Sequence, residues 1–334
     1  MMKKILTIGI PVYNMERYLR RCLESVTGIK NRDLCEIIVV NDGSKDRSLE
    51  IAREFEARNP GFLRVIDKPN GGWGSGINRS IEEARGVYYK SLDSDDWFCT
   101  ESLDRFIEEL QTIEADMVLS PYNEVDENDN KIERDFSPEL YGQTYDLNDY
   151  VRMLGTFRKT IHAVTYRTKM LKEHRFHVWE KFYGDIDYIN TPLSYVKTIY
   201  FSPYRIYQYL VGREGQSISV KGYRAHIADY LSVARKLISS TGYKQPQSPI
   251  EKYLFEDNLN IAAFAYRLLM QPSLCGNEKD SGIRLKEFDR FLKVAVPQLY
   301  KKVTSKTRKF GVSPISVWRL CGLNIYKILS AHLV

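Results

Sequence analysis

The sequence predicts an α/β fold followed by a mostly helical region. Three observations support this prediction. Short apolar or β-branched runs alternate with segments of helical periodicity over the first 120 residues. Polar or glycine-rich loops follow four of the predicted strands, and β-branched runs become sparse beyond Tyr223. Strands that alternate with helices at this spacing indicate a parallel sheet with right-handed crossovers.

Strands and helices alternate regularly up to residue 120. Apolar or β-branched runs predict strands at residues 5–10, 36–40, 62–66, 87–92 and 116–120. Apolar residues at helical spacing predict helices around residues 19–26 and 49–55 and at 75–85 and 101–113. Further on we expect a turn at 127–130 between two short strands, a helix within 183–196, and helices from 223 onward with a break at 245–249.

The composition indicates a globular protein with a sizeable core. The 334 residues are 43% hydrophobic and 12% aromatic, and 49 Lys and Arg against 43 Asp and Glu give a formal net charge of +6. These values exclude a highly charged disordered or histone-like chain, and the length allows more than one structural unit.

The positive charge is concentrated at the C-terminal end. Residues 291–334 contain no Asp or Glu and eight basic residues, so residues 1–290 carry a net charge of −2. The basic residues are Lys293, Lys301, Lys302, Lys306, Arg308, Lys309, Arg319 and Lys327. This asymmetry predicts an anionic partner for one end of the chain.

Cysteine usage and the N-terminal segment predict a cytoplasmic protein. The five cysteines have no CxxC spacing, which argues against a disulfide framework or a structural zinc site and favours a reducing compartment. The apolar run at 5–10 ends at Pro11 without a cleavage site, so it is interpreted as a first strand rather than a signal peptide. No stretch approaches the roughly 18 apolar residues that span a bilayer.

Three carboxylates crowd the loop after the fourth predicted strand, at Asp93, Asp95 and Asp96. Such anions repel one another unless they share a cation, and Mg²⁺ and Mn²⁺ prefer oxygen ligands while keeping positions open for phosphate. One interpretation is a metal that bridges protein carboxylate and diphosphate. The other is an Asp-rich turn in which Asp95 or Asp96 caps the next helix.

The loop after the second predicted strand also allows two interpretations. Asp42 can accept a hydrogen bond from a nucleotide base, with Gly43 allowing close approach of the backbone. Alternatively, the loop is a turn in which Ser44 or Asp46 caps the next helix.

The glycine-rich loop after the third predicted strand does not indicate a nicotinamide site. Gly72, Gly74 and Gly76 follow the third strand rather than the first, and their spacing is wrong for a dinucleotide fingerprint.

Four motifs occur in register, at residues 8–14, 37–46, 70–72 and 92–97. In this order and spacing they resemble family-2 glycosyltransferases, which are inverting, nucleotide-sugar-dependent enzymes, here of the bacterial cell-surface polysaccharide type. The resemblance runs from residue 5 to about residue 219. It implies the GT-A fold, a Rossmann-like mixed sheet with helices on both faces.

The resemblance also implies a domain organisation. Residues 1–222 would form the catalytic domain, with a nucleotide-sugar half at 1–120 and an acceptor half at 121–222. Residues 223–334 would form a helical C-terminal region with the basic tail.

The resemblance implies roles for the loop residues. Pro11, Tyr13 and Glu16 would border the nucleotide base, and Asp42 would accept its N–H. Asp95 would ligate a divalent metal, Mn²⁺ or Mg²⁺, that neutralises the leaving diphosphate. The other residues implied in donor binding are Asn70, Gly71, Asp93 near the ribose, Ser94, Asp96, Arg213, Gln216 and Ser217. For the last three, an ordinary polar loop is the alternative.

The family places its catalytic base in a Glu-Asp pair at the start of a helix in the second half. The matching segment is 182–188, in which Asp185 aligns with the Asp and is therefore implied as the base that deprotonates the acceptor hydroxyl. Asp187 is the alternative base. An N-terminal helix carboxylate that only favours the helix dipole is the structural alternative.

Three departures from the family pattern are visible. Asn41 replaces the commoner first Asp of the second loop, and Gly184 replaces the Glu of the Glu-Asp pair. The family's Ala-Arg-Asn in the third loop appears as Gly76-Ile77-Asn78, which removes an arginine.

We therefore expect an inverting transfer of a sugar from a nucleotide donor, with UDP implied by the family, to a saccharide or lipid-linked saccharide. A nucleotidyltransferase and a non-catalytic nucleotide-sugar-binding protein are the alternatives. The loop at 11–14 lacks the basic, glycine-rich phosphate loop expected of a nucleotidyltransferase. The missing Glu at position 184 keeps the non-catalytic alternative open.

The basic tail has two interpretations. An amphipathic helix with Ile315, Trp318, Ile325, Ile328 and Leu329 would dock peripherally on anionic lipid at the inner face of the membrane. Alternatively, the tail packs on the rest of the protein or on another subunit of a homo-oligomer. Nucleic acid is not an expected partner, because no nucleic-acid-binding module accompanies the charge.

Overall fold

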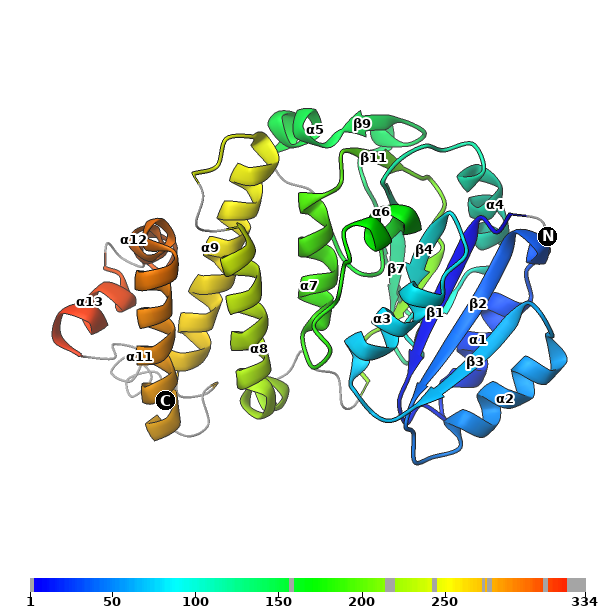
Figure 1. The fold of residues 1–334 in the computed structure, drawn as a ribbon, viewed down its shortest axis with the longest axis horizontal. Helices are drawn as coiled ribbons and strands as arrows, with labels where there is room; N and C mark the ends of the chain where they lie inside the picture. The colour runs from blue at the N-terminus through cyan, green and yellow to red at the C-terminus, as the bar shows by residue number, and fades with distance from the viewer. Residues whose placement is uncertain are drawn as a thin grey trace. The chain divides into compact units, whose positions relative to one another are not determined.

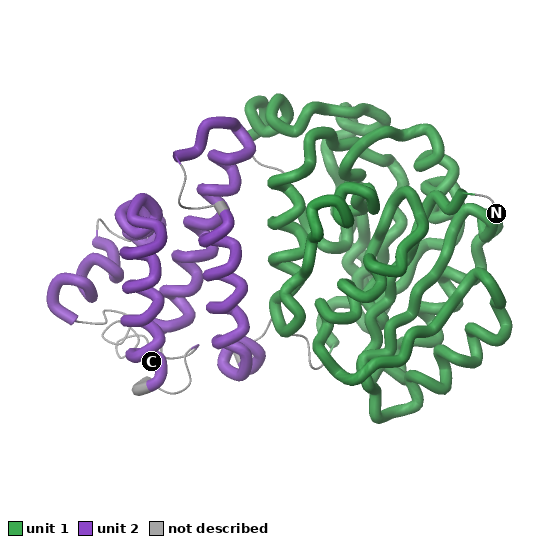
Figure 2. Tube along the Cα trace, in the orientation of Figure 1, with its two compact units in different colours: residues 1–214 green, residues 215–334 purple. Residues whose placement is uncertain are grey.

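The computed structural model describes residues 3–155, 159–213, 220–241, 245–271, 274, 278–308 and 312–322. The chain forms two compact units, Met1–Glu214 and Gly215–Val334 (Figure 2). Every strand among the described residues lies in the first unit, and the second unit is helical (Figure 1).

An eight-stranded sheet forms the centre of the first unit, in the order β3-β2-β1-β4-β10-β6-β11-β9. The strands are β1 (Leu6–Val12), β2 (Cys35–Asp42), β3 (Leu63–Lys68), β4 (Tyr88–Ser91), β6 (Met117–Leu119), β9 (Thr144–Asp146), β10 (Val164–Arg167) and β11 (Thr198–Phe201). Strands β1 and β2 are buried along their whole length, as expected for central strands covered on both faces.

All five predicted strands of the first 120 residues are present and run parallel to one another, as predicted, but the complete sheet is mixed. β1 pairs in parallel with β2 and β4, and β2 pairs in parallel with β3. Strand β10, which comes later in the chain, lies antiparallel between β4 and β6. The alternation of strands and helices in the first 120 residues carries no information about a strand that arrives afterwards. The sheet is therefore mixed, as the GT-A resemblance implies.

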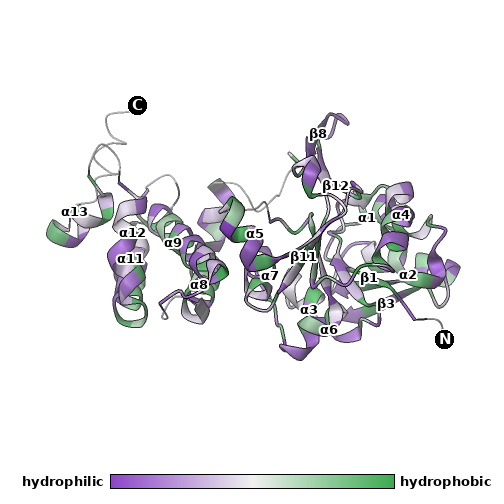
Figure 3. Cartoon of the chain, turned by 90° about the horizontal axis from the view of Figure 1, so that it is seen from above, coloured by the Kyte–Doolittle hydropathy of each residue, from purple (hydrophilic) through white to green (hydrophobic). Residues whose placement is uncertain are grey.

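Helices cover both faces of this sheet. Helices α1 (Leu19–Thr27), α2 (Ser48–Arg58), α3 (Trp73–Glu83) and α4 (Thr100–Leu110) occur where the sequence predicts them. Figure 3 shows α1 and α4 on one side of the sheet and α3 and α6 (Thr168–Glu173) on the other. Helix α7 (Gly184–Asn190) packs against α3, and α5 (Leu147–Leu154) follows β9.

A second, four-stranded sheet has the order β5-β12-β7-β8. It consists of β5 (Trp97–Phe98), β7 (Tyr122–Val125), β8 (Lys131–Arg134) and β12 (Tyr207–Leu210). Strands β7 and β8 form the predicted hairpin, in which Asp126 accepts hydrogen bonds from the backbone N–H groups of Asn128 and Asn130. Because β12 pairs with β5, the end of the first unit lies beside the loop that carries Asp93–Asp96.

The second unit contains α8 (Val220–Thr241), α9 (Pro249–Met270), α11 (Glu278–Ala295), α12 (Pro297–Lys306) and α13 (Pro314–Cys321). The predicted break at 245–249 is confirmed, and Ser248 and Glu251 form a capping box at the start of α9. Figure 3 shows both hydrophilic and hydrophobic residues on these helices, as amphipathic helices require.

Part of the basic tail is used inside the second unit. Arg319 of α13 forms an ion pair with Asp289 of α11 at 2.7 Å and stacks on the ring of Tyr300 at 3.5 Å. Lys306 forms an ion pair with Glu256 at 2.8 Å. For these groups, the interpretation of a tail packed on its own unit is confirmed. Ile325, Ile328 and Leu329 of the predicted amphipathic segment lie outside the described residues.

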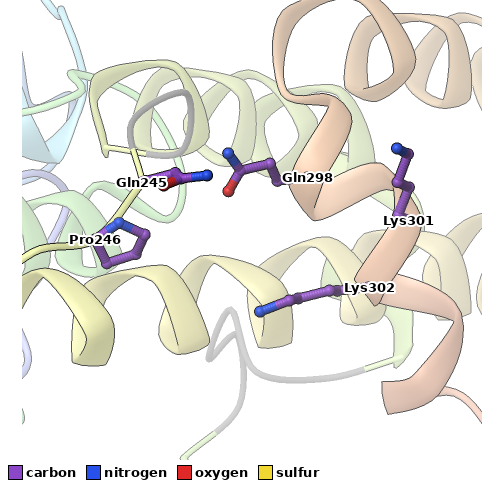
Figure 4. Close-up of a pocket in the computed structure, with 5 residues that line it drawn as sticks. All are labelled: Gln245, Pro246, Gln298, Lys301 and Lys302. Carbon is purple, nitrogen blue, oxygen red and sulfur yellow. The ribbon is translucent and has the colours of Figure 1, made fainter.

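Lys301 and Lys302 are exposed on α12 and line a pocket together with Gln245, Pro246 and Gln298 (Figure 4). None of the described lining residues carries a carboxylate, and the pocket belongs to the second unit, whereas the predicted donor loops belong to the first. Among the helices that the structure describes, none is both long and apolar enough to cross a membrane.

Candidate active site

The predicted donor loops meet at one edge of the central sheet. Strands β1, β2, β3 and β4 are parallel neighbours, so the loops that follow them all emerge at their carboxyl ends. Residues 11–16, 42–48, 68–72 and 93–96 are thereby gathered from four distant parts of the first unit.

The first and second loops are joined by backbone-to-side-chain hydrogen bonds. The side-chain oxygen of Asn14 accepts from the N–H of Lys45 at 2.7 Å. The N–H of Glu16 donates to Asp46 at 3.0 Å, and the carboxylate of Glu16 accepts from the N–H of Arg47 at 2.9 Å. Glu16 therefore holds the two loops together. Tyr13 remains 47% exposed beside them.

Asp42 is an anchor for the third loop. Its buried carboxylate accepts from the N–H groups of Gly71 and Gly72 at 2.9 and 2.7 Å and forms an ion pair with Lys68 at 2.6 Å. The side-chain amide of Asn70 donates to the Asp42 carbonyl. A carboxylate has about four acceptor positions, so about one remains for a ligand N–H.

Asp96 is also held by the protein itself. It is fully buried and accepts from the hydroxyl of Tyr207 at 2.7 Å and the N–H of Leu210 at 2.8 Å, both in β12. Burial, together with the negative charges of Asp95 and Asp93, raises the pKa of Asp96 well above its usual range. Helix α4 begins only at Thr100 and has no side-chain cap, so the helix-capping interpretation of this loop is wrong.

Asp95 lies next to two arginines. Its carboxylate is ion-paired with Arg213, and the guanidinium of Arg21 donates to its carbonyl at 3.3 Å. Arg21 also stacks on Trp97 at 3.6 Å, which fixes the position of that guanidinium. Ser94, the neighbour of Asp95, is buried. Of the residues predicted to close over the site, Gln216 and Ser217 lie outside the described residues.

Asp93 is the link between the carboxylate loop and helix α7. Burial and the negative charge of Asp95 raise the pKa of Asp93 to about 7, while the hydrogen bond from the indole N–H of Trp73, at 2.7 Å, lowers it. The negative charge of Asp185 also raises this pKa. Asp185 and Asp93 are therefore close enough for their charges to interact.

Asp185 and Asp187 have opposite environments on α7. Asp185 lies in the first turn of the helix and is accessible to solvent. The protein around its carboxylate still displaces part of the water, and this desolvation raises its pKa. Asp187 is completely buried and accepts from the N–H of Trp179 at 2.7 Å and the hydroxyl of Thr191 at 2.6 Å. Asp187 is thus part of the packing that holds α7.

The three glycines of the third loop are required by close packing. A Cβ on Gly74 would lie 2.1 Å from the carbonyl oxygen of Trp179, one on Gly72 would lie 2.4 Å from that of Glu180, and one on Gly76 would lie 2.9 Å from Pro11. The N–H of Gly74 donates to the Glu180 carbonyl at 2.9 Å. Gly72 and Gly74 therefore place the start of α3 directly against the segment that leads into α7, and Gly76 places α3 against β1.

With this geometry in place, the comparison with known proteins identifies the family. The sequence profile of "Glycosyl transferase family 2" matches residues 7–175, about half of the chain. The chain belongs to this family. Membership argues against the nucleotidyltransferase alternative and agrees with the four loop motifs.

Curated relatives of this glycosyltransferase are bacterial. It is 29% identical over 297 residues to the putative glycosyltransferase EpsH of Bacillus subtilis, covering 79% of this chain and 84% of EpsH. It is 26% identical over 289 residues to the glycosyltransferase GlyA of Streptococcus pneumoniae, covering 83% of this chain. The match covers only 39% of the length of GlyA.

Solved structures share the fold of this glycosyltransferase. Staphylococcus aureus TarS, residues 1–349, solved in complex with UDP-GlcNAc, matches with a TM-score of 0.67 and 20% identity, covering 94% of this chain and 86% of TarS. A Pyrobaculum calidifontis mannosyltransferase, in complex with GDP-Man and Mn²⁺, matches with a TM-score of 0.53 and 15% identity, covering 92% and 87% of the two chains. At these identities the likeness establishes the GT-A fold.

The carboxylates of this glycosyltransferase suit a metal that is shared with a substrate. Within the described residues, no group of three or more His, Cys, Asp or Glu side chains forms a ready metal site. Asp96 is occupied by β12, Asp93 receives the Trp73 hydrogen bond, and Asp95 is ion-paired with Arg213, so a metal on Asp95 would compete with Arg213 for the carboxylate. One carboxylate plus substrate phosphates and water is an arrangement that Mg²⁺ and Mn²⁺ accept.

Sequence reasoning missed three residues of this glycosyltransferase site: Lys68, Trp73 and Tyr207. Lys68 ends a strand and pairs with Asp42, and Tyr207 binds both the Asp96 carboxylate and the Asp93 N–H. Trp73 contacts Asp93 from within the glycine-rich loop. A large aromatic residue between two glycines was the available signal for Trp73.

Proposed function

We propose that this protein is an inverting glycosyltransferase that moves a sugar from a UDP-sugar to a saccharide or lipid-linked saccharide in cell-surface polysaccharide synthesis. The observation that carries the proposal is the relation of Asp185 to the carboxylate loop. Asp185, a solvent-accessible residue with a raised pKa, lies close enough to Asp93 of the carboxylate loop for the two charges to interact. A base and a donor-binding site would thereby share one surface.

The donor would bind across the loops of the nucleotide-sugar half, residues 1–120. Tyr13 is exposed beside loops that Glu16 and Asp42 hold in place. The nucleotide base would therefore bind to loops that are already ordered. Asp93 would lie near the ribose. The TarS structures with UDP-GlcNAc and UDP support UDP as the nucleotide carrier.

A divalent metal, Mn²⁺ or Mg²⁺, would be held by Asp95. When bound, it would supply positive charge that neutralises the leaving diphosphate. Arg213 provides a second positive charge at the same carboxylate and would turn to the diphosphate when the donor enters. Asp96 would support Asp95 indirectly by fixing the loop to β12.

Asp185 would act as the base. It would take the proton from the acceptor hydroxyl while that oxygen attacks the anomeric carbon on the side opposite the leaving diphosphate. A raised pKa brings a carboxylate closer to the operating pH, which improves general-base catalysis. Asp187 is unsuited to this role because it is buried and both of its oxygens accept hydrogen bonds within the protein.

The acceptor would lie on the half formed by residues 121–222, from which α7 projects Asp185. Residues 223–334 would form the separate helical region of a cytoplasmic enzyme at the inner face of the membrane. Exposed Lys301 and Lys302 are among the described basic residues that would face anionic lipid. The non-catalytic alternative is tested by turnover.

The test is a donor panel. Purified protein is incubated with different UDP-sugars and Mn²⁺, and donor binding and slow release of UDP are measured. We expect one donor to bind and to be consumed, and Asp185→Asn to bind it without consuming it. Binding of a donor by the wild type without any UDP release, in the presence of candidate acceptors, would support the non-catalytic alternative instead.

A further inference from the structure

We propose that Trp73 is a positioning residue that holds the Asp93 carboxylate and the base-bearing helix α7 in one arrangement. This inference rests on the proposed function, because it assigns Asp93 to the donor and Asp185 to the acceptor hydroxyl. It concerns a residue that neither the sequence motifs nor the resemblance singled out.

Trp73 contacts Asp93 through its polar atom. The indole N–H donates to one carboxylate oxygen of Asp93 at 2.7 Å. A hydrogen bond from a rigid ring fixes the orientation of the carboxylate. In the proposed function, the second oxygen of Asp93 would serve the donor.

Trp73 contacts α7 through its ring. The ring meets Tyr188 of α7 edge to face, with the ring centres 6.2 Å apart and the planes at 85°. A Cβ built on Gly184 would lie 3.2 and 3.3 Å from the Cε3 and Cζ3 atoms of Trp73. The same side chain therefore touches a donor-side carboxylate and the first residue of the helix that carries Asp185.

The backbone around Trp73 is fixed against the same segment. Gly72 and Gly74 lie so close to the Glu180 and Trp179 carbonyls that neither position has room for a Cβ. Further along α3, the side chain of Asn78 donates to the Val178 carbonyl at 2.9 Å and accepts from the Val178 N–H at 2.7 Å. Trp73 thus projects from a stretch of backbone that is already packed against the segment leading into α7.

This arrangement explains why position 184 has no side chain. The family's Glu cannot be accommodated in the present geometry, because its Cβ would lie 2.4 Å from the Trp179 carbonyl oxygen and against the ring of Trp73. Trp73 therefore occupies part of the space that a side chain at position 184 would need. The loss of Glu at 184 and the presence of Trp at 73 are two parts of one arrangement.

The test compares substitutions of two tryptophans, Trp73 and Trp179, which lie on segments that pack against each other. Trp73→Phe keeps a ring beside Gly184 but removes the N–H that binds Asp93. Trp179→Phe is the matched control, since within the described residues the indole N–H of Trp179 has no hydrogen-bond partner. The affinity for UDP with Mn²⁺ is measured by calorimetry, and donor KM and kcat are measured by UDP release.

We expect Trp73→Phe to raise the Kd for UDP and the donor KM about tenfold while kcat stays near the wild-type value, since one hydrogen bond to a carboxylate is lost. Trp179→Phe should leave the Kd, the donor KM and kcat near the wild-type values. Trp73→Ala should match Trp73→Phe in donor KM and should also lower kcat, because α7 loses the ring contact. Equal donor KM in Trp73→Phe and Trp179→Phe would overturn the proposal.

The outcomes separate this inference from the function on which it rests. A wild-type protein that binds no UDP and no UDP-sugar overturns the proposed function and the inference with it. A wild-type protein that binds and transfers, with Trp73→Phe unaffected in Kd and KM, overturns only the inference. If Trp73→Ala fails to fold, the comparison of Trp73→Phe with Trp179→Phe still decides.

Discussion

Asp185 and Asp187 lie two residues apart in α7, yet Asp185 is exposed and Asp187 is completely buried. We expect Asp185→Asn to lower sugar transfer by about 10²–10⁴-fold, the usual contribution of a positioned base. Because Asp185 has no part in the donor loops, UDP binding should stay unchanged. Calorimetry and UDP release measure the two quantities. Full transfer activity in Asp185→Asn would refute the base assignment.

Asp187→Asn is predicted to act on stability. Both Asp187 oxygens accept hydrogen bonds, and Asn offers one oxygen and an NH₂ group that cannot accept from the Trp179 N–H or the Thr191 hydroxyl. We expect a loss of about 1–3 kcal/mol in the free energy of unfolding, measured by urea denaturation. A variant as stable as the wild type but without transfer activity would move the base assignment to Asp187.

The pH dependence of kcat follows from the pKa of Asp185. A base works in its ionised form, and desolvation raises the pKa of Asp185 above its ordinary value. As the pH falls, activity should therefore begin to fail above the usual pKa of an aspartate, which is about 3.9. A pH profile of kcat at saturating donor measures this limb. A limb at or below the usual value would contradict the desolvated environment.

Metal removal should act through Asp95. We expect a chelator to weaken UDP binding to the wild-type protein and addition of Mn²⁺ to restore it. In Asp95→Ala, Mn²⁺ should no longer strengthen UDP binding, and transfer should be lost. Titration of UDP with and without Mn²⁺ measures both effects. A metal dependence that persists in Asp95→Ala would place the metal elsewhere.

Gly74 tests the packing between α3 and the segment before α7. In Gly74→Ala the new methyl group would lie 2.1 Å from the Trp179 carbonyl oxygen, so we expect a loss of about 1–3 kcal/mol in the free energy of unfolding. Gly282→Ala in α11 is the matched control, because a Cβ there meets nothing within 4 Å. It should be neutral or stabilising by up to about 1 kcal/mol. Thermal unfolding compares the two variants.

Charge reversal on α12 tests the membrane surface. Each lysine near an anionic surface contributes about 1 kcal/mol, so Lys301→Glu with Lys302→Glu should reduce binding to phosphatidylserine-containing vesicles by more than tenfold. Phosphatidylcholine vesicles are the control for lipid binding that is independent of charge. Sedimentation with vesicles gives the bound fraction. Unchanged binding would favour contacts within the protein or with another subunit.

The elements and the site loops could be predicted from sequence, because each depends on residues close together in the chain. The strand at 36–40 and the helix at 19–26 follow from local patterns. The meeting of the site loops follows from their positions directly after parallel strands. The position of β10 could not be predicted, since it is decided by pairing with β4 and β6, far away in the chain.

The hydrogen-bond and ion-pair partners of the site residues could not be predicted from the sequence either. Asp42, Asp93 and Asp96 could each be singled out as acids, but their neighbours Lys68, Trp73 and Tyr207 come from other elements. The steric requirement for glycine at position 184 could not be predicted either, because it comes from the carbonyl oxygen of Trp179 and the ring of Trp73. A local sequence pattern identifies a candidate side chain, whereas its hydrogen-bond and packing partners depend on the fold.

The insertion of β10 between β4 and β6 sets the order in which the chain can mature. During synthesis β4 and β6 leave the ribosome first, and their facing edges keep unpaired N–H and C=O groups until residues 164–167 follow. Residues 1–120 alone are therefore an incomplete folding unit. An exchange of residues 121–222 between relatives would bring a foreign β10 to the edges of β4 and β6, so we expect the two segments to be inherited together.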